Sequence, residues 1–147
     1  MIDIHRISEN DIEAVASLET EIFSDAWSAK SIKETHEQRH ALILGAYKEG
    51  ALIGYVIFYY VLDEGEIARI AVSPFHRRQG VAEEIFYGLL RFCAEKEIER
   101  ILLDVRKSND AAIAFYRKSG FSEDGIRKKF YDNPKEDAIL MSMDIAR

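Results

Sequence analysis

The sequence predicts an α/β fold of the mixed α+β type, in which a mixed central sheet has helices on both faces. Two observations lead to this prediction. Strand-like apolar runs alternate with amphipathic helical segments along the chain. The segment 67–105 has the order strand, helix, strand, which makes the two strands parallel with a right-handed crossover. The length of 147 residues predicts one domain, 1–147.

The first half of the chain predicts a strand, two helices and a hairpin. Residues 2–7 are the short strand. Residues 8–23 predict a helix, because a serine can cap the first turn and apolar residues follow at helical spacing. Residues 28–38 predict a shorter helix that a serine also caps. Two apolar runs, 41–47 and 51–62, flank a glycine turn and therefore predict a hairpin.

The second half begins with the predicted βαβ unit. Residues 66–73 predict a strand that a proline ends, and a loop with basic side chains follows at 75–79. Gly80 opens a long helix, because apolar residues then recur at every fourth position. The strand 101–105 completes the unit. The remaining elements are a helix at 109–119, ended by Gly120, and strands at 121–130 and 138–144.

Composition and charge exclude several classes of protein. The chain is 48% hydrophobic and 31% charged, which excludes disordered and low-complexity classes. A net charge of −6 argues against nucleic-acid binding, which needs a dense basic surface. The four histidines lack the spacing of a metal site. Cys93 is expected to be a buried hydrophobe, with a reactive thiol as the alternative. Charges near the start interrupt any signal peptide, and no uncharged run is long enough to span a membrane, so we expect a cytoplasmic protein.

The loop between the strand 66–73 and the following helix gives the strongest indication of a ligand-binding site. Arg77 and Arg78 precede Gly80, and the first turn of a helix has backbone N–H groups without intrahelical partners. Gly80 and Ala82 leave little side chain in the way, so a pyrophosphate could lie against this backbone. The alternative is a surface loop with two solvated arginines.

This loop resembles the acetyl-CoA signature of the GNAT acyltransferase superfamily, which is Arg/Gln-x-x-Gly-x-Gly/Ala between a strand and a helix. Here it reads Arg77-Arg78-Gln79-Gly80-Val81-Ala82. Further segments are similar to the RimI-type ribosomal-protein-alanine N-acetyltransferases, namely 26–28, 104–109, 111–112, 115–116, 120–121, 131–134 and 136–138. The resemblance therefore covers most of the chain and implies a GNAT-type sheet.

The resemblance implies that acetyl-CoA is the cofactor and that the backbone of one strand and the loop hold it. Its pantetheine arm would run between the two parallel strands, as an added strand does. A backbone N–H near Val72 would meet the oxyanion. The implied cofactor-binding residues are Ile70, Ala71, Val72, Arg77, Arg78, Gln79, Gly80, Val81, Ala82 and Asn109.

Asp104 is the first candidate for a general base. It lies in an apolar strand, where a carboxylate needs a partner or a purpose. The alternative is a structural carboxylate that a backbone N–H caps or that Arg100 or Arg106 pairs with. RimI-type proteins usually have glutamate here, and the aspartate arm is shorter by about 1.5 Å. A second water could make up for this difference, or Glu66 on the neighbouring strand, the reserve base, could contribute.

Tyr116 is the candidate acid. It follows Asn109 by seven residues, so both face the same side of a helix. The resemblance implies that Tyr116 donates a proton to the leaving thiolate, while core packing is the alternative. Three residues are candidates for the acceptor side of the site. Trp27 belongs either to the core or to the wall of a peptide groove, and Tyr131 lies in a stretch that resembles the family's substrate-side loop. The third is Arg69, at a position where relatives often have asparagine.

The resemblance implies transfer of an acetyl group to a protein N-terminus, with the alanine of a small-subunit ribosomal protein as the usual target. An α-amine has a pKa of about 7.7–8.0 and a lysine about 10.4, so freeing the α-amine costs about 3–4 kcal/mol less. Two alternatives stay open. One is a GNAT enzyme for a small-molecule amine or a lysine side chain, and the other is a non-catalytic acyl-CoA-binding module.

Overall fold

The structure is a computed structural model and describes residues 1–145. Its strands are β1 (Asp3–Arg6), β2 (Ala41–Lys48), β3 (Ala51–Val61), β4 (Glu64–Val72), β5 (Arg100–Arg106), β6 (Ser122–Tyr131) and β7 (Glu136–Asp144). Its helices are α1 (Ile12–Ile22), α2 (Ala29–His36), α3 (Val81–Glu95) and α4 (Asp110–Ser119), with 3-10 turns at Glu9–Asp11 and Pro74–His76. Every predicted element is present, with ends shifted by one to a few residues.

The strands form one seven-stranded sheet in the order β1-β2-β3-β4-β5-β7-β6. The neighbours β4 and β5 are parallel, and the other neighbouring pairs are antiparallel. Because α3 connects β4 to β5, the predicted βαβ unit and the mixed sheet are confirmed. The strand β6 lies at one edge of the sheet, where Arg127, Lys128 and Lys129 are exposed; charged residues at an edge discourage pairing with other chains.

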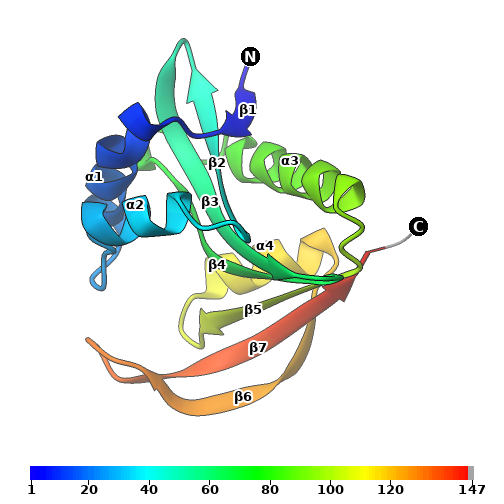
Figure 1. The fold of residues 1–147 in the computed structure, drawn as a ribbon. Coiled ribbons are helices and arrows are strands. Elements are labelled where there is room, and N and C mark those ends of the chain that lie inside the picture. The colour runs from blue at the N-terminus through cyan, green and yellow to red at the C-terminus, as the bar shows by residue number, and fades with distance from the viewer. Residues whose placement is uncertain (146–147) are drawn as a thin grey trace.

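Helices cover both faces of the sheet, as predicted (Figure 1). On one face, α1 and α2 pack on β3 through a cluster that includes Val15, Ile32 and Ile57. On the other face, α3 and α4 bury a larger cluster that includes Leu89. Cys93 belongs to this second cluster and is buried, and burial raises the pKa of its thiol to about 12. The prediction of a buried cysteine is confirmed.

Local capping explains where several helices begin. The Ser28 hydroxyl accepts a hydrogen bond from the N–H of Ser31 at 3.1 Å, which caps α2. The carboxamide oxygen of Asn109 accepts one from the N–H of Ala112 at 3.1 Å and caps α4. Gly80, at the start of α3, has φ +78°, a conformation in which a side chain is strained.

The sheet divides between β4 and β5. The two strands pair from Glu64↔Arg100 to Ile67↔Leu103, although both continue beyond this point, to Val72 and Arg106. A register shift between β3 and β4 places Ala68 as an extra residue where the pairing with β5 ends; such a bulge bends a strand. The strands therefore diverge, and Figure 1 shows α4 beside the gap.

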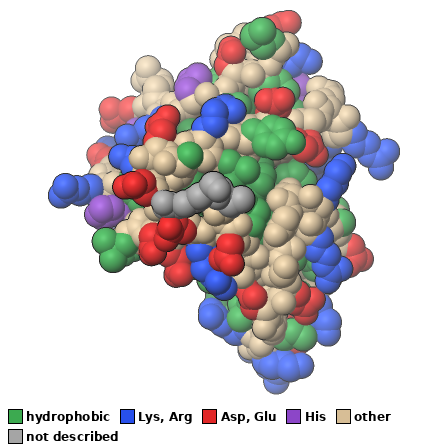
Figure 2. Space-filling model, turned by 90° about the vertical axis from the view of Figure 1, so that its right-hand side faces the viewer, with side chains coloured by type: hydrophobic (Ala, Val, Ile, Leu, Met, Phe, Trp, Pro, Cys, Tyr) green, Lys and Arg blue, Asp and Glu red, His purple; other side chains and the backbone are tan. Residues whose placement is uncertain are grey.

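On the face in Figure 2, acidic and basic side chains are interspersed without a continuous basic area. None of the helices in residues 1–145 is long and apolar enough to cross a bilayer.

Candidate active site

A cavity of about 350 Å³ lies where β4 and β5 diverge. Its walls come from the end of α1 and the loop after it, from β4, β5 and α4, and from the turn between β6 and β7. The predicted site residues that line it are Arg69, Ile70, Asp104, Asn109, Tyr116 and Tyr131. Residues from both halves of the chain thus meet in one place.

Asp104 is a half-buried carboxylate that lines this cavity. Among the described residues it makes no hydrogen bond or ion pair, although its charge acts on Glu66 and Tyr131. The structural alternative required a partner, but Arg100 pairs with Asp144 and Arg106 pairs with Glu136 and Asp25. The Asp104 oxygens are therefore available to a molecule in the cavity.

Tyr116 reaches the same cavity from α4, and its side chain also belongs to the core. The residue is 5% exposed, and its ring packs against Phe121 with the centroids 5.4 Å apart. Burial raises the pKa of the hydroxyl well above its usual value, so the group is protonated at neutral pH. Asn109 also lines the cavity, and its amide nitrogen is left to donate because its oxygen caps α4.

The turn between β6 and β7 closes one side of the cavity, and Arg106 on β5 holds it. The guanidinium donates to the carbonyl oxygens of Asp132 and Pro134, both at 2.9 Å. Its carbon lies 4.5 Å from the centroid of the Tyr131 ring. Burial and the charge of Asp104 raise the pKa of Tyr131 to about 12. The Tyr131 hydroxyl is thus a stable hydrogen-bond donor.

Of the predicted catalytic and acceptor-side residues, Glu66 and Trp27 lie outside the lining of this cavity. Glu66 lies on β4 opposite Leu102 of β5 and remains accessible to solvent. Partial desolvation of its carboxyl and the charge of Asp104 raise its pKa. Trp27 packs on the α1–α2 side of the sheet and lines another hollow. Trp27 is thus partly buried against the core and also forms part of a surface hollow, so both interpretations of this residue stay open.

Two carboxylates near the cavity were not singled out from the sequence. Glu19 of α1 is fully buried and binds Arg69, and Asp25 lines the cavity and binds both Arg69 and Arg106. The sequence does contain an indication that the Glu19 carboxylate is buried. Glu19 occupies the apolar stripe of α1 between Val15 and Ile22, where a carboxylate is expected to have a buried partner.

A smaller hollow of about 290 Å³ is formed by the loop before α3. Val72, Arg77, Arg78, Gly80, Val81 and Ala82 are among its lining residues. Arg78 has φ +61° and Gly80 has φ +78°, and left-handed residues of this kind occur in the turns whose backbone N–H groups bind anions. Both arginines are exposed and have no carboxylate partner among the described residues. These features are suited to binding a diphosphate. One carboxylate in the lining, that of Glu83, would repel the anion.

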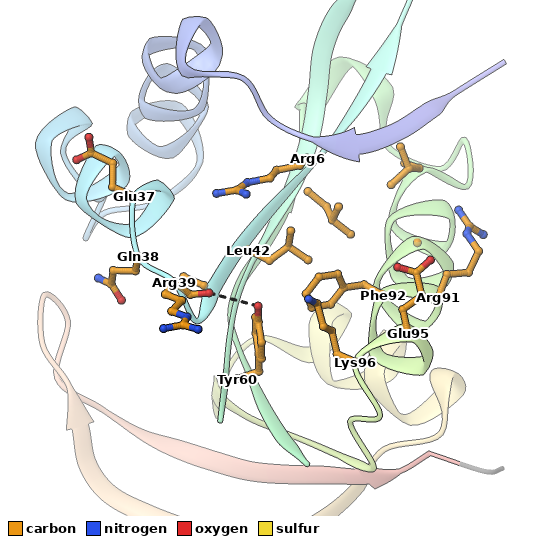
Figure 3. Close-up of a pocket in the computed structure, with 14 residues that line it drawn as sticks. Arg6, Glu37, Gln38, Arg39, Leu42, Tyr60, Arg91, Phe92, Glu95 and Lys96 are labelled. Carbon is orange, nitrogen blue, oxygen red and sulfur yellow. Dashed lines mark hydrogen bonds between the residues drawn. The ribbon is translucent and has the colours of Figure 1, made fainter. Parts of the chain in front are cut away.

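A larger hollow, of about 610 Å³, lies beside the C-terminal half of α3 (Figure 3). Leu42, Tyr60 and Phe92 line it between charged side chains such as Arg39 and Arg91. None of the predicted site residues is part of its lining. The sequence motifs therefore point to the cavity between β4 and β5 and not to this larger hollow.

Comparisons with known proteins agree with the motifs. The sequence pattern described as "Acetyltransferase (GNAT) family" matches residues 12–121. The chain is 31% identical to [Ribosomal protein bS18]-alanine N-acetyltransferase of Escherichia coli (strain K12), over 99% of both chains. It is 36% identical to a Bacillus subtilis (strain 168) protein whose name gives the same activity provisionally, over 89% of this chain and 87% of the relative. The crystal structure of the ribosomal-protein-S18-alanine N-acetyltransferase from Escherichia coli superimposes with a TM-score of 0.92 and 30% identity, covering 100% of this chain and 96% of that one.

Proposed function

The chain belongs to the acetyltransferase (GNAT) family, and from this premise we propose that it moves an acetyl group from acetyl-CoA to the α-amino group of a protein N-terminus. The proposed acceptor is the N-terminal alanine of a small-subunit ribosomal protein, because the names of similar proteins state that target. The observation that carries the proposal is the cavity between β4 and β5, in which an unpaired Asp104 and a protonated Tyr116 lie together.

We propose that the chain holds acetyl-CoA at two places. Arg77, Arg78 and the free N–H groups at the start of α3 bind its diphosphate. The edge of β4 from Ile70 to Val72, which β5 leaves unpaired, offers backbone groups to the amides of the pantetheine arm. The molecule supplies an acetyl group that is activated as a thioester. Gln79 is the weakest member of the predicted set, because its side chain is exposed and bonds to the Phe75 carbonyl at 3.5 Å.

Asp104 is the proposed general base. Only a neutral amine can attack the thioester, and an α-amine needs about 3–4 kcal/mol less than a lysine to lose its proton. A carboxylate acting through a water molecule is sufficient for this modest task. Glu66 has a raised pKa and lies near enough for its charge to interact with Asp104. Glu66 is therefore the reserve base, and it could also pass the proton taken from the amine on to solvent.

Tyr116 is the proposed donor to the departing sulfur, and Tyr131 and Asn109 are proposed to orient the substrates. Tyr116 keeps its proton at the pH of the reaction because burial raises its pKa. Tyr131 and the β6–β7 turn form the wall next to the acceptor, and Arg106 holds this turn in place through its hydrogen bonds and its contact with the Tyr131 ring. Each of these groups lines the cavity, so each can reach a substrate placed there.

The experiment uses purified protein, acetyl-CoA and two short peptides. One peptide starts with alanine, and the other is the same peptide with a blocked N-terminus and an internal lysine. We expect free thiol and a mass gain of one acetyl group on the α-amine of the first peptide only. Acetylation of the blocked peptide would favour a lysine acceptor. Tight binding of acetyl-CoA without transfer to either peptide or to small amines would favour a binding module.

A further inference from the structure

Arg69 connects the buried Glu19 to the wall of the acceptor cavity. Glu19 has no exposed side-chain area, and its two oxygens accept four hydrogen bonds. Arg69 donates two of them, from Nε to Oε2 at 3.1 Å and from Nη2 to Oε1 at 3.0 Å. The Tyr55 hydroxyl donates at 2.5 Å, and the N–H of Trp27 donates at 2.9 Å. This filled coordination fixes the carboxylate and, through it, the guanidinium.

The same guanidinium holds the loop between α1 and α2. Its Nη2 donates to the Asp25 carbonyl oxygen at 3.1 Å and pairs with the Asp25 carboxylate at 3.3 Å. Its carbon lies 3.8 Å from the centroid of the Phe23 ring. Phe23 and Asp25 both line the cavity that contains Asp104. One side chain of β4 therefore contacts two residues of the wall and the buried anchor.

We propose that Arg69 is a positioning residue that, with Glu19 as its anchor, sets how large a first residue the acceptor cavity admits. This inference rests on the proposed function. A Phe23 ring held against the guanidinium limits the space next to the reacting amine. Arginine is required because its planar guanidinium can donate two hydrogen bonds to a carboxylate and stack on an aromatic ring at the same time. A lysine ammonium is a point charge and cannot make both contacts.

The test compares two peptides that differ only in their first residue, alanine or leucine. The variant is Arg69→Lys. The matched control is Arg117→Lys, which makes the same change in an exposed ion pair between the last turn of α4 and Glu123, and neither residue of that pair lines the cavity. We expect Arg69→Lys to raise the KM for the alanine peptide and to raise the leucine-to-alanine ratio of kcat/KM about 10-fold, the lower end of what a hydrophobic pocket discriminates. The KM for acetyl-CoA and the values for Arg117→Lys stay within about twofold of the wild type.

The ratio separates positioning from mere stabilisation, because partial unfolding lowers the rates on both peptides equally. An unchanged ratio in a folded Arg69→Lys protein overturns the proposal. If that variant does not fold, Phe23→Leu gives the answer: it removes the ring and must raise the same ratio, and an unchanged ratio again overturns the proposal. Wild-type protein that acetylates neither peptide overturns the proposed function as well, whereas wild-type activity with unchanged ratios overturns this inference alone.

Discussion

Replacing Tyr116 by phenylalanine removes one oxygen atom from the cavity between β4 and β5. The ring remains in its aromatic cluster with Phe115 and Phe121. The hydroxyl makes no hydrogen bond to the described residues, so its loss leaves no protein group unsatisfied. We therefore expect the free energy of unfolding to change by less than about 0.5 kcal/mol.

The expected loss of activity follows from the pKa of the hydroxyl. Burial raises it above its usual value of about 10, whereas a thiol has a pKa of about 8.5. Complete proton transfer from Tyr116 to the leaving sulfur is thus uphill, and its main effect is a hydrogen bond to a developing thiolate. A hydrogen bond to a charged group contributes about 1.5–3 kcal/mol, which corresponds to a decrease in kcat of about 10- to 150-fold.

The assay follows thiol release with an alanine-starting peptide, and urea unfolding is measured on the same samples. Tyr87→Phe is the matched control, since Tyr87 is 55% exposed on α3. The wild-type rate should show no loss from Tyr116 ionisation as the pH rises to about 10, because its folded pKa lies higher still. A Tyr116→Phe protein with kcat within about threefold of the wild type would refute the proposed role, and a matching loss of stability would assign Tyr116 to packing.

Three further outcomes test other parts of the structure. Asp104→Asn should lower kcat/KM on the alanine peptide by about 10²- to 10⁴-fold, as measured by thiol release, whereas Asp104→Glu should retain most of the wild-type kcat/KM. Glu19→Ala should lower the free energy of unfolding in urea by about 3–5 kcal/mol, because the Arg69 guanidinium, with a side chain 13% exposed, loses its buried partner. Gly65→Ala should cost about 1–3 kcal/mol in the same assay, since a Cβ there would lie 2.1 Å from Cζ of Phe58.

Most of the fold could be predicted from local signals. The expected strand 101–105 lies within β5 (Arg100–Arg106), and Ser28 caps α2 as expected. Asn109 proved to be the cap of α4 rather than its first residue. These features depend on residues close together in sequence, where spacing and capping chemistry act directly.

The network around Glu19 could not be predicted in full, because its partners are distant in the sequence. Tyr55 and Arg69 lie 36 and 50 residues further along the chain. The apolar stripe of α1 indicates that the carboxylate is buried, but the identity of its partners depends on how the helix packs on β3 and β4. The divergence of β4 from β5 also depends on pairing, since the extra residue is Ala68, which has no distinctive side chain.

Two arginines on the diverging strands hold two loops that line the cavity. Arg69 of β4 holds the loop between α1 and α2, and Arg106 of β5 holds the turn between β6 and β7. Asp25 lies within 3.3 Å of the first and 3.8 Å of the second, and the Ser24 hydroxyl donates to the Asn133 carbonyl across the same space at 2.8 Å. The two loops are therefore fixed both to the diverging strands and to each other. A change at either arginine should alter acceptor selection before it alters binding of acetyl-CoA, whose diphosphate is proposed to bind at the loop before α3.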